Sequence, residues 1–196
     1  MSAEVRLLWG PAWRVVAEAP RVPVVVDVYS LAHGPGSRSF LELGSAAFDA
    51  AYGVDGAPEP IVRELLDEDV RERIGRLSCE RLQIRDGLVD IRKRHHFHFD
   101  EHREMGEALE LAADLAAQVG ALSREAEAAL VREAGRAAGP YRGGPDPGVL
   151  ASLTAARDHE VSAARRRTRR RWNKSRAAAG ALIGGWFLFE LVVRGL

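Results

Sequence analysis

Hydrophobic and polar residues alternate most regularly between residues 80 and 93, where the pattern predicts a β-hairpin. Asp86-Gly87 at its centre is a strong signal for a two-residue type I′ turn, because both central positions of that turn need positive φ angles. With this turn, Glu80 lies opposite Lys93 across the two strands. One face of the hairpin then collects four apolar side chains, which are Leu82, Ile84, Val89 and Ile91. Pattern and turn chemistry therefore agree on a single register.

Other segments have the β-branched or alternating character of strands. We expect strands over residues 5–9, 13–16, 22–31 and 38–43. The segment 22–31 gives the strongest signal, because valines dominate it and no helical period is present. Pro23 places the start of that strand at a sheet edge or a bulge. Residues 46–54 fit a helix and a strand equally well.

Apolar residues at helical spacing, together with capping residues, predict four helices. They cover residues 61–77, residues 100–119, residues 124–138 and a stretch that begins near Val149. Pro60 suits the first turn of the first helix. Asp100 and Ser123 are suited to cap the second and third helices.

These elements predict an α+β fold, in which helices pack on one face of an antiparallel sheet. A C-terminal helix that crosses a membrane completes the expected architecture. We expect four parts in chain order: an α+β domain over 1–138, a Gly/Pro linker over 139–148, a basic helix over 149–176 and an apolar segment over 177–193.

Charge is distributed unevenly along the chain, although 28 basic and 28 acidic residues balance overall. The first 164 residues carry 19 basic and 27 acidic residues, a net charge of −8, whereas residues 165–176 hold eight basic residues and no acidic one. The lone Cys79 excludes a disulfide scaffold. The N-terminus lacks the basic and apolar regions of a signal peptide, so we expect the domain to stay in the cytoplasm.

Residues 177–193, here called the apolar tail, contain 17 residues and a single charge, Glu190. A membrane-spanning helix needs about 20 apolar residues, with a range of roughly 17–25. Arg176 and Arg194 flank the segment and can extend toward the two interfaces. We therefore expect a single-pass membrane protein whose N-terminal domain is cytoplasmic, because positive charge marks the cytoplasmic side. An interfacial helix and a buried or self-associating soluble helix are the alternatives.

Residues 165–176, here called the basic neck, precede the apolar tail. Each basic residue near an anionic leaflet adds about 1 kcal/mol of attraction, so membrane lipid is the expected partner. Gly180 and Gly184 form a G-x-x-x-G pattern that lets two membrane helices approach closely, so a homodimer through the tail is a further expectation. The expected lipid-binding residues are Arg165, Arg166, Arg167, Arg169, Arg170, Arg171, Lys174 and Arg176.

A histidine cluster over residues 95–102 is the most enzyme-like feature of the chain. His96, His98 and His102 are candidate metal ligands, since imidazole and carboxylate groups together suit zinc. The cluster lacks the H-E-x-x-H and C-x-x-C patterns of zinc sites, and a solvated surface is the alternative. The sequence also lacks a phosphate-binding loop, a dinucleotide fingerprint and a G-x-S-x-G elbow, so no cofactor and no catalytic residue is predicted.

Three stretches of the domain form a combination of packing and turn motifs. They are Phe48-Asp49-Ala50-Ala51-Tyr52-Gly53-Val54, then Leu65-Leu66-Asp67 with Val70-Arg71 and Leu77, then the strand-Asp-Gly-strand followed by Leu109, Ala112, Leu115 and Ala116. Together they resemble poorly characterised bacterial proteins in which a small α+β domain is attached to membrane helices. The resemblance covers residues 5–120. It implies membrane attachment and carries no catalytic residue to this chain.

Three hypotheses for the function follow. The first is a membrane-tethered interaction or scaffolding protein, with a protein partner that the sequence does not identify. The second is a nucleic-acid-binding protein that uses the basic neck, with Trp172 stacking on a base. The third is a small metal-dependent enzyme at the histidine cluster. The first is favoured, and a nucleic-acid partner is not expected, because the domain is acidic and has no nucleic-acid-binding motif.

Overall fold

The computed structural model describes the backbone of residues 3–7, 12–33, 41–94, 101–138 and 145–194. Within these ranges it also describes the side chains, except at 3–7, 12, 33, 94, 101, 137–138 and 171–194.

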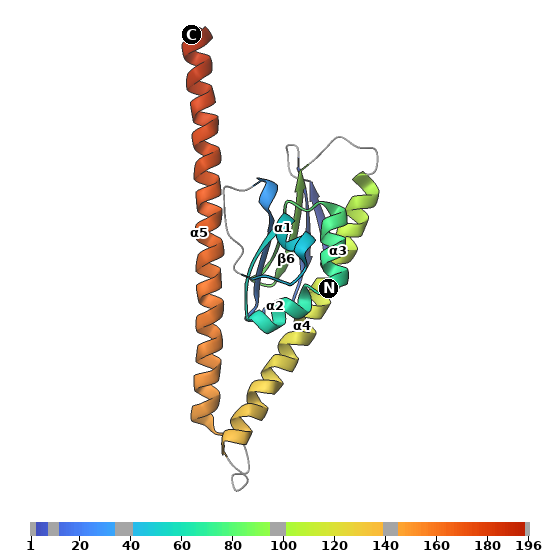
Figure 1. Ribbon diagram of the computed structural model, residues 1–196, viewed down its shortest axis with the longest axis vertical. Helices are drawn as coiled ribbons and strands as arrows, with labels where there is room; N and C mark the ends of the chain where they lie inside the picture. The colour runs from blue at the N-terminus through green and yellow to red at the C-terminus, as the bar shows by residue number, and fades with distance from the viewer. Residues whose placement is uncertain (1–2, 8–11, 34–40, 95–100, 139–144, 195–196) are drawn as a thin grey trace.

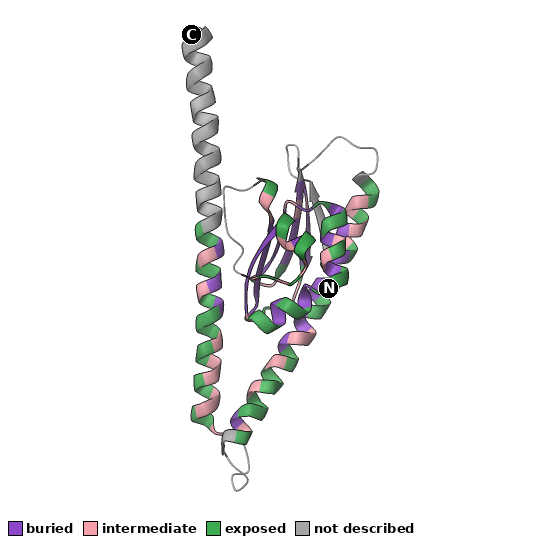
Figure 2. Cartoon of the chain, viewed as in Figure 1, coloured by how far each residue is buried: buried purple, intermediate pink, exposed green. Residues whose placement is uncertain are grey.

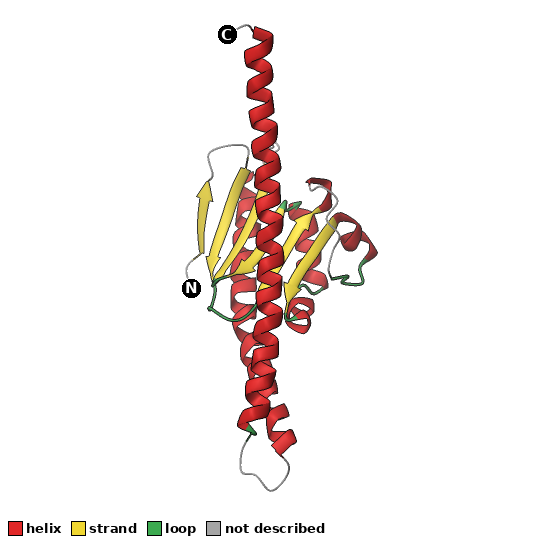
Figure 3. Cartoon of the chain, turned by 90° about the vertical axis from the view of Figure 1, so that its left-hand side faces the viewer, coloured by secondary structure: helices red, strands yellow, loops and turns green. Residues whose placement is uncertain are grey.

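A six-stranded antiparallel sheet forms the centre of the molecule, with the strand order β1-β2-β6-β5-β3-β4 (Figures 1 and 3). The strands are β1 (Ala3–Leu7), β2 (Ala12–Glu18), β3 (Val25–Ser30), β4 (Tyr52–Ala57), β5 (Arg81–Arg85) and β6 (Leu88–Arg94). Every neighbouring pair is antiparallel. The prediction of an α+β fold with an antiparallel sheet is therefore confirmed.

Helices cover both faces of this sheet (Figures 1 and 3). The helices are α1 (Ala46–Ala51), α2 (Glu59–Leu65), α3 (Glu68–Leu77), α4 (Glu101–Ala138) and α5 (Pro147–Arg194), with a 3₁₀ turn η1 at Leu31–His33. Helices α1–α4 lie on one face and α5 on the other. The helices of the domain thus share one face, as predicted. The C-terminal helix α5 packs on the opposite face, which was not predicted, because Val25 and Ala57 point away from the main core and pack against it.

The main hydrophobic core lies between the sheet and helices α1–α4, where buried residues concentrate (Figure 2). Val15, Leu82 and Ile91 contribute to it from the strands, and Leu111 and Leu115 from α4. Cys79 is also buried there. Burial raises the pKa of its thiol to about 12, so the thiol stays protonated near neutral pH. Cys79 is accordingly a packing residue of the core.

The β5–β6 hairpin matches the sequence prediction in turn and register. Asp86 and Gly87 have φ angles of 55° and 79°, which is the type I′ pattern. Leu82 pairs with Ile91, and Ile84 with Val89. The ladder ends one residue earlier than predicted, at Arg81 and Arg92. Beyond it, Lys93 forms an ion pair with Glu104 of α4 at 2.6 Å.

Two predicted helix boundaries differ from the structure. The helix expected over 61–77 is divided into α2 and α3 at Asp67, whose carboxylate accepts a hydrogen bond from the Val70 amide at 2.9 Å. The helices expected over 100–119 and 124–138 form the single helix α4. Gly120 does not end the helix; it lies against Pro20, where a Cβ would come within 2.9 Å of the proline ring. Ser123 is buried within α4 rather than capping a new helix.

Two segments in the first third of the chain also differ from the predictions. Residues 46–54, which fit either structure, divide into helix α1 and the start of strand β4. Residues 41–43 belong to a predicted strand but form a loop, in which the Leu41 amide donates to the Val54 carbonyl at 3.1 Å. The rest of that predicted strand, residues 38–40, lies outside the described residues.

We predict that Gly87→Ala lowers the free energy of unfolding by about 1–2 kcal/mol, because an L-residue is strained at its positive φ. A Cβ there would also lie 2.8 Å from Cγ of Arg21 and 3.2 Å from the Ala19 carbonyl oxygen. Urea unfolding of the full chain measures the change. Gly75→Ala is the matched control. A Cβ at this position of α3 would meet no atom within 4 Å beyond its own helix backbone, so the substitution should raise the free energy of unfolding by about 0.5–1 kcal/mol. Equal effects of the two substitutions would contradict the assigned turn.

Candidate functional site

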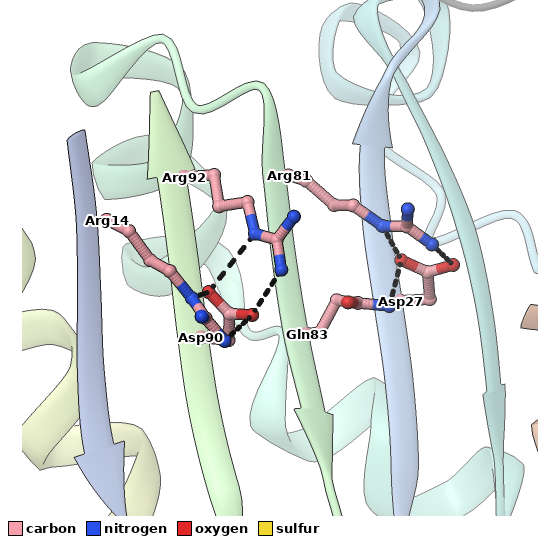
Figure 4. Close-up of polar contacts among 6 residues, drawn as sticks. All are labelled: Arg14, Asp27, Arg81, Gln83, Asp90 and Arg92. Carbon is pink, nitrogen blue, oxygen red and sulfur yellow. Dashed lines mark hydrogen bonds and ion pairs between the residues drawn. The ribbon is translucent and has the colours of Figure 1, made fainter. Parts of the chain in front are cut away.

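The face of the sheet opposite the main core carries two rows of polar side chains. Side chains alternate between the faces of a strand, so each apolar position of the hairpin leaves its polar neighbour on the other face. Three arginines lie opposite one another on the adjacent strands β2, β6 and β5. We call them the arginine row, which consists of Arg14, Arg92 and Arg81. The next register positions form the acidic row, which consists of Asp90, Gln83, Asp27 and Asp55. Figure 4 shows six of these residues linked in two groups.

Asp90 joins two arginines in the group that we call the Asp90 cluster: Arg14, Asp90 and Arg92. Arg14 donates to both carboxylate oxygens from Nε and Nη2, at 2.7 and 2.8 Å. Arg92 donates from the same two atoms at 3.4 and 2.9 Å. Burial by itself raises the pKa of Asp90, but the hydrogen bonds and charges of the two arginines outweigh burial and lower it. The cluster therefore holds one carboxylate and two guanidinium groups, a net charge of +1.

Asp27 forms the second group, beneath the surface of the same face. Its side chain is 0 % exposed, and Arg81 donates to both carboxylate oxygens, at 2.7 and 2.8 Å. Gln83 adds a hydrogen bond from Nε2 at 3.2 Å. A buried carboxylate is costly unless charged or hydrogen-bonding partners surround it, and a two-pronged arginine is the strongest such partner. This group is consequently a structural ion pair within the sheet.

Asp55 forms the third ion pair, and its partner comes from α5. Arg167 donates to it from Nε and Nη2 at 2.9–3.3 Å, while the Asp55 side chain is 0 % exposed. Beside this pair, two residues of α5 pack on Val25 and Ala57; these are Val161 and Ala164. The apolar part of the contact is small, so the ion pair is its principal specific interaction.

The structure gives protein partners to two residues of the basic neck. Arg167 is paired with Asp55, whose buried carboxylate needs the guanidinium. The expectation that Arg167 binds lipid stays a prediction. Arg165 lies 3.4 Å from Asp86 in the hairpin turn, and its side chain remains 47 % exposed. Three further arginines are exposed: Arg166, Arg169 and Arg170. The side chains of Arg171, Lys174 and Arg176 lie outside the described residues.

The candidate metal ligands are not assembled by the described part of the chain. His96 and His98 lie outside the described residues, and His102 is exposed in the first turn of α4. Within the ranges whose side chains are described, no three His, Cys, Asp or Glu side chains are grouped to hold a metal ion.

Among the residues that the structure describes, no helix combines the length and apolar character needed to cross a membrane. The expected anchor at 177–193 lies in the part of α5 whose side chains fall outside that description, and so do Gly180 and Gly184. The backbone of α5 continues through these positions to Arg194.

The face of the sheet that carries the arginine row and the acidic row, here called the charged face, was not predicted from the sequence. The hairpin was interpreted only as a packing element. A usable signal was present at Asp27, which interrupts a run of strand-forming residues, whereas Asp55 precedes Gly56 in a segment with turn-like composition. A carboxylate inside such a strand indicates a cationic partner. The partners themselves lie 54 residues away at Arg81 and 112 residues away at Arg167, and no local pattern connects them.

Arginine remains protonated at physiological pH, and the three carboxylates described above are all paired with it. The charged face is therefore suited to bind anions rather than to transfer protons. No protein-family model, curated protein or solved structure matches the chain.

We predict that Asp90→Asn lowers the free energy of unfolding by about 1–3 kcal/mol at pH 7, because two guanidinium groups lose their shared anion. The pKa of Asp90 is lowered in the folded state, so its contribution is complete above the unfolded value of about 3.9 and is lost as pH falls through the native pKa. Urea unfolding measured between pH 7 and pH 3 should show that the difference in free energy of unfolding between the wild type and Asp90→Asn decreases as the pH falls. Asp114→Asn, at an exposed ion pair with Arg73, should cost less than about 1 kcal/mol. A difference in free energy of unfolding that stays constant with pH would contradict the stabilising role of the ionised Asp90 carboxylate.

We also predict that Arg167→Gln loosens α5, because Asp55 would keep a buried charge without its guanidinium. Hydrogen exchange of the full chain should become about tenfold faster over residues 161–170, which corresponds to about 1.4 kcal/mol. Arg166→Gln removes the same charge from an exposed neighbour and should leave the exchange rate within about twofold, since surface charges contribute little. If both variants accelerate exchange equally, the ion pair does not hold the helix.

Proposed function

We propose that the protein is a membrane-tethered interaction or scaffolding protein, whose cytoplasmic α+β domain is held by a single-pass anchor at 177–193. One observation carries the proposal: the arginine row lies at the end of the charged face toward which α5 leads the apolar tail. The order of contacts along α5 gives this direction. Ala164 packs with Ala57, and Arg167 then pairs with Asp55, two residues nearer to the arginine row on β4.

Helix and strand spacings relate the arginine row to the start of the tail. From Asp55 to Gly53, which is level with the row, β4 advances about 6.6 Å. Four residues of α5 beyond Arg167 advance about 6 Å, so position 171 is level with the same row. The apolar tail begins six residues later, about 9 Å further along the helix. This distance is close to the electrostatic screening length of about 8 Å at physiological salt.

Basic side chains lie at the end of the face nearest the tail. Arg14 and Arg92 lie there, while Glu18 and Asp86 at the opposite end of the strands lie beside Arg85 and Arg165. The domain as a whole is acidic, so an anionic leaflet repels it unless its basic end approaches first. The arginine row and the exposed neck arginines supply such an end.

A continuous α5 supports tethering without a flexible linker beside the membrane. The helix runs from Pro147 to Arg194, and Figures 1 and 3 show it passing along the sheet and continuing beyond it. The distance between the sheet and the tail along the helix axis is thus fixed by the continuous helix. Packing of two copies through Gly180 and Gly184 forms part of the proposal, because small residues permit close approach of membrane helices.

We predict that the full chain stays in the membrane fraction through a carbonate wash, whereas a chain ending at residue 176 is released. Ile183→Asp tests the tail within the full chain, because an acidic residue near a helix centre costs about 2.5–3.5 kcal/mol on insertion. Glu190→Gln is the control and should retain or strengthen wash resistance. Fractionation followed by immunoblotting measures both.

Release of the full chain by the wash would overturn the proposed anchor. So would equal wash resistance of the chain ending at residue 176. Retention of Ile183→Asp at the wild-type level would show that attachment does not depend on an inserted apolar helix.

A further inference from the structure

The three ion-paired groups of the charged face differ in charge and exposure. The pairs Asp27–Arg81 and Asp55–Arg167 each match one carboxylate with one guanidinium. The Asp90 cluster has two guanidinium groups on one carboxylate and carries an extra positive charge. Arg14 and Arg92 are 26 % and 20 % exposed, compared with 10 % for Arg81 and 37 % for Arg167. Asp90 is 7 % exposed, whereas the carboxylates of the other two groups are completely buried. The Asp90 cluster therefore combines a net charge with access from solvent.

Asp90 fixes the orientation of both guanidinium groups. Each arginine contacts the carboxylate through Nε and Nη2, which sets the plane of each group. Asp90 uses two of the five N–H donors of Arg14. Because the side chains are already ordered, an anion that binds them loses less conformational freedom than it would by ordering two mobile arginines.

The cluster lies on the part of the charged face that α5 leaves open. Helix α5 packs mainly on β4 and β3, whereas Arg14 belongs to β2, and Asp90 and Arg92 to β6. Figure 4 shows the three side chains together on the same face as Arg81 and Asp27. The cluster also belongs to the end of the sheet that approaches the leaflet in the proposed orientation.

Phosphate is the anion whose geometry fits paired guanidinium groups best, because its oxygens accept several N–H donors at once. A phosphodiester headgroup carries one negative charge, which balances the net charge of +1 on the cluster. We propose that the Asp90 cluster binds the phosphate of an anionic phospholipid in the leaflet that surrounds the tail; this inference rests on the proposed function. The domain then contacts the membrane directly, in addition to the contact made by the basic neck.

Arg14→Gln is the test variant, because it makes the cluster neutral and leaves Asp90 paired with Arg92. Arg73→Gln is the matched control: it removes the same charge from an ion-paired arginine that is 19 % exposed on α3, across the sheet from the charged face. Its partner Asp114 is 54 % exposed and remains solvated after the substitution. The full chain in detergent micelles is titrated with phosphatidylglycerol or with phosphatidylcholine, and native mass spectrometry counts the bound lipids.

We expect Arg14→Gln to raise the apparent dissociation constant for phosphatidylglycerol about fivefold, the effect of one basic residue at an anionic surface. Binding of phosphatidylcholine should not change, and Arg73→Gln should stay within about twofold of the wild type. The triple variant Arg14→Gln, Asp90→Asn, Arg92→Gln replaces the ions with amides and should show at least the same loss. This second variant keeps the test valid if Arg14→Gln disturbs folding.

Equal loss in Arg14→Gln and Arg73→Gln would overturn the site, because total charge alone would then explain lipid binding. Displacement of phosphatidylglycerol by an equal concentration of inorganic phosphate would overturn the lipid as the source of the anion. The carbonate wash separates this inference from the proposed function. A wash-resistant chain with unchanged lipid preference in Arg14→Gln rejects the headgroup site alone, whereas a wash-sensitive chain that loses its lipid preference rejects the anchor alone.

Discussion

The ion pair between Asp55 and Arg167 determines how the two parts of the molecule are arranged. Asp55 has no exposed surface, so its charge has to be neutralised within the fold, and Arg167 supplies the neutralising group from α5. The apolar residues beside the pair are few, which makes the position of the helix depend on matched charge more than on buried area. Together with the packing of Val161 and Ala164 on Val25 and Ala57, this ion pair sets the direction of α5 along the sheet, and with it the end of the sheet that faces the tail.

Predictions from the sequence were correct where a structure is determined by residues that lie close together in the chain. The Asp86-Gly87 turn fixed the hairpin register because two residues determine the turn and alternation determines the faces. Asp67 was read as part of a continuous helix because its capping role depends on backbone geometry rather than on hydrophobic spacing. The position of α5 on the far face was not predicted, because it depends on a pairing between residues 112 positions apart.

Charged side chains have two separate roles on the charged face of the sheet. Completely buried carboxylates and their arginines hold strands and helix together, and these ions contribute structure rather than binding. The Asp90 cluster, whose two arginines are partly exposed, has a surplus of one positive charge on the same face of the sheet. The two uses are adjacent because the antiparallel register brings arginines into one row and carboxylates into the next.

Because Arg167 faces the sheet, its position also determines the direction in which each later residue of α5 lies around the helix axis. An α-helix turns by about 100° per residue, so Gly180 lies about 140° and Gly184 about 100° around the axis from Arg167. The glycine pattern therefore lies on the side of the helix turned away from the sheet. In the proposed pairing through these glycines, the two sheets would lie on the outside of the pair, with the charged faces of both domains directed toward the central helices.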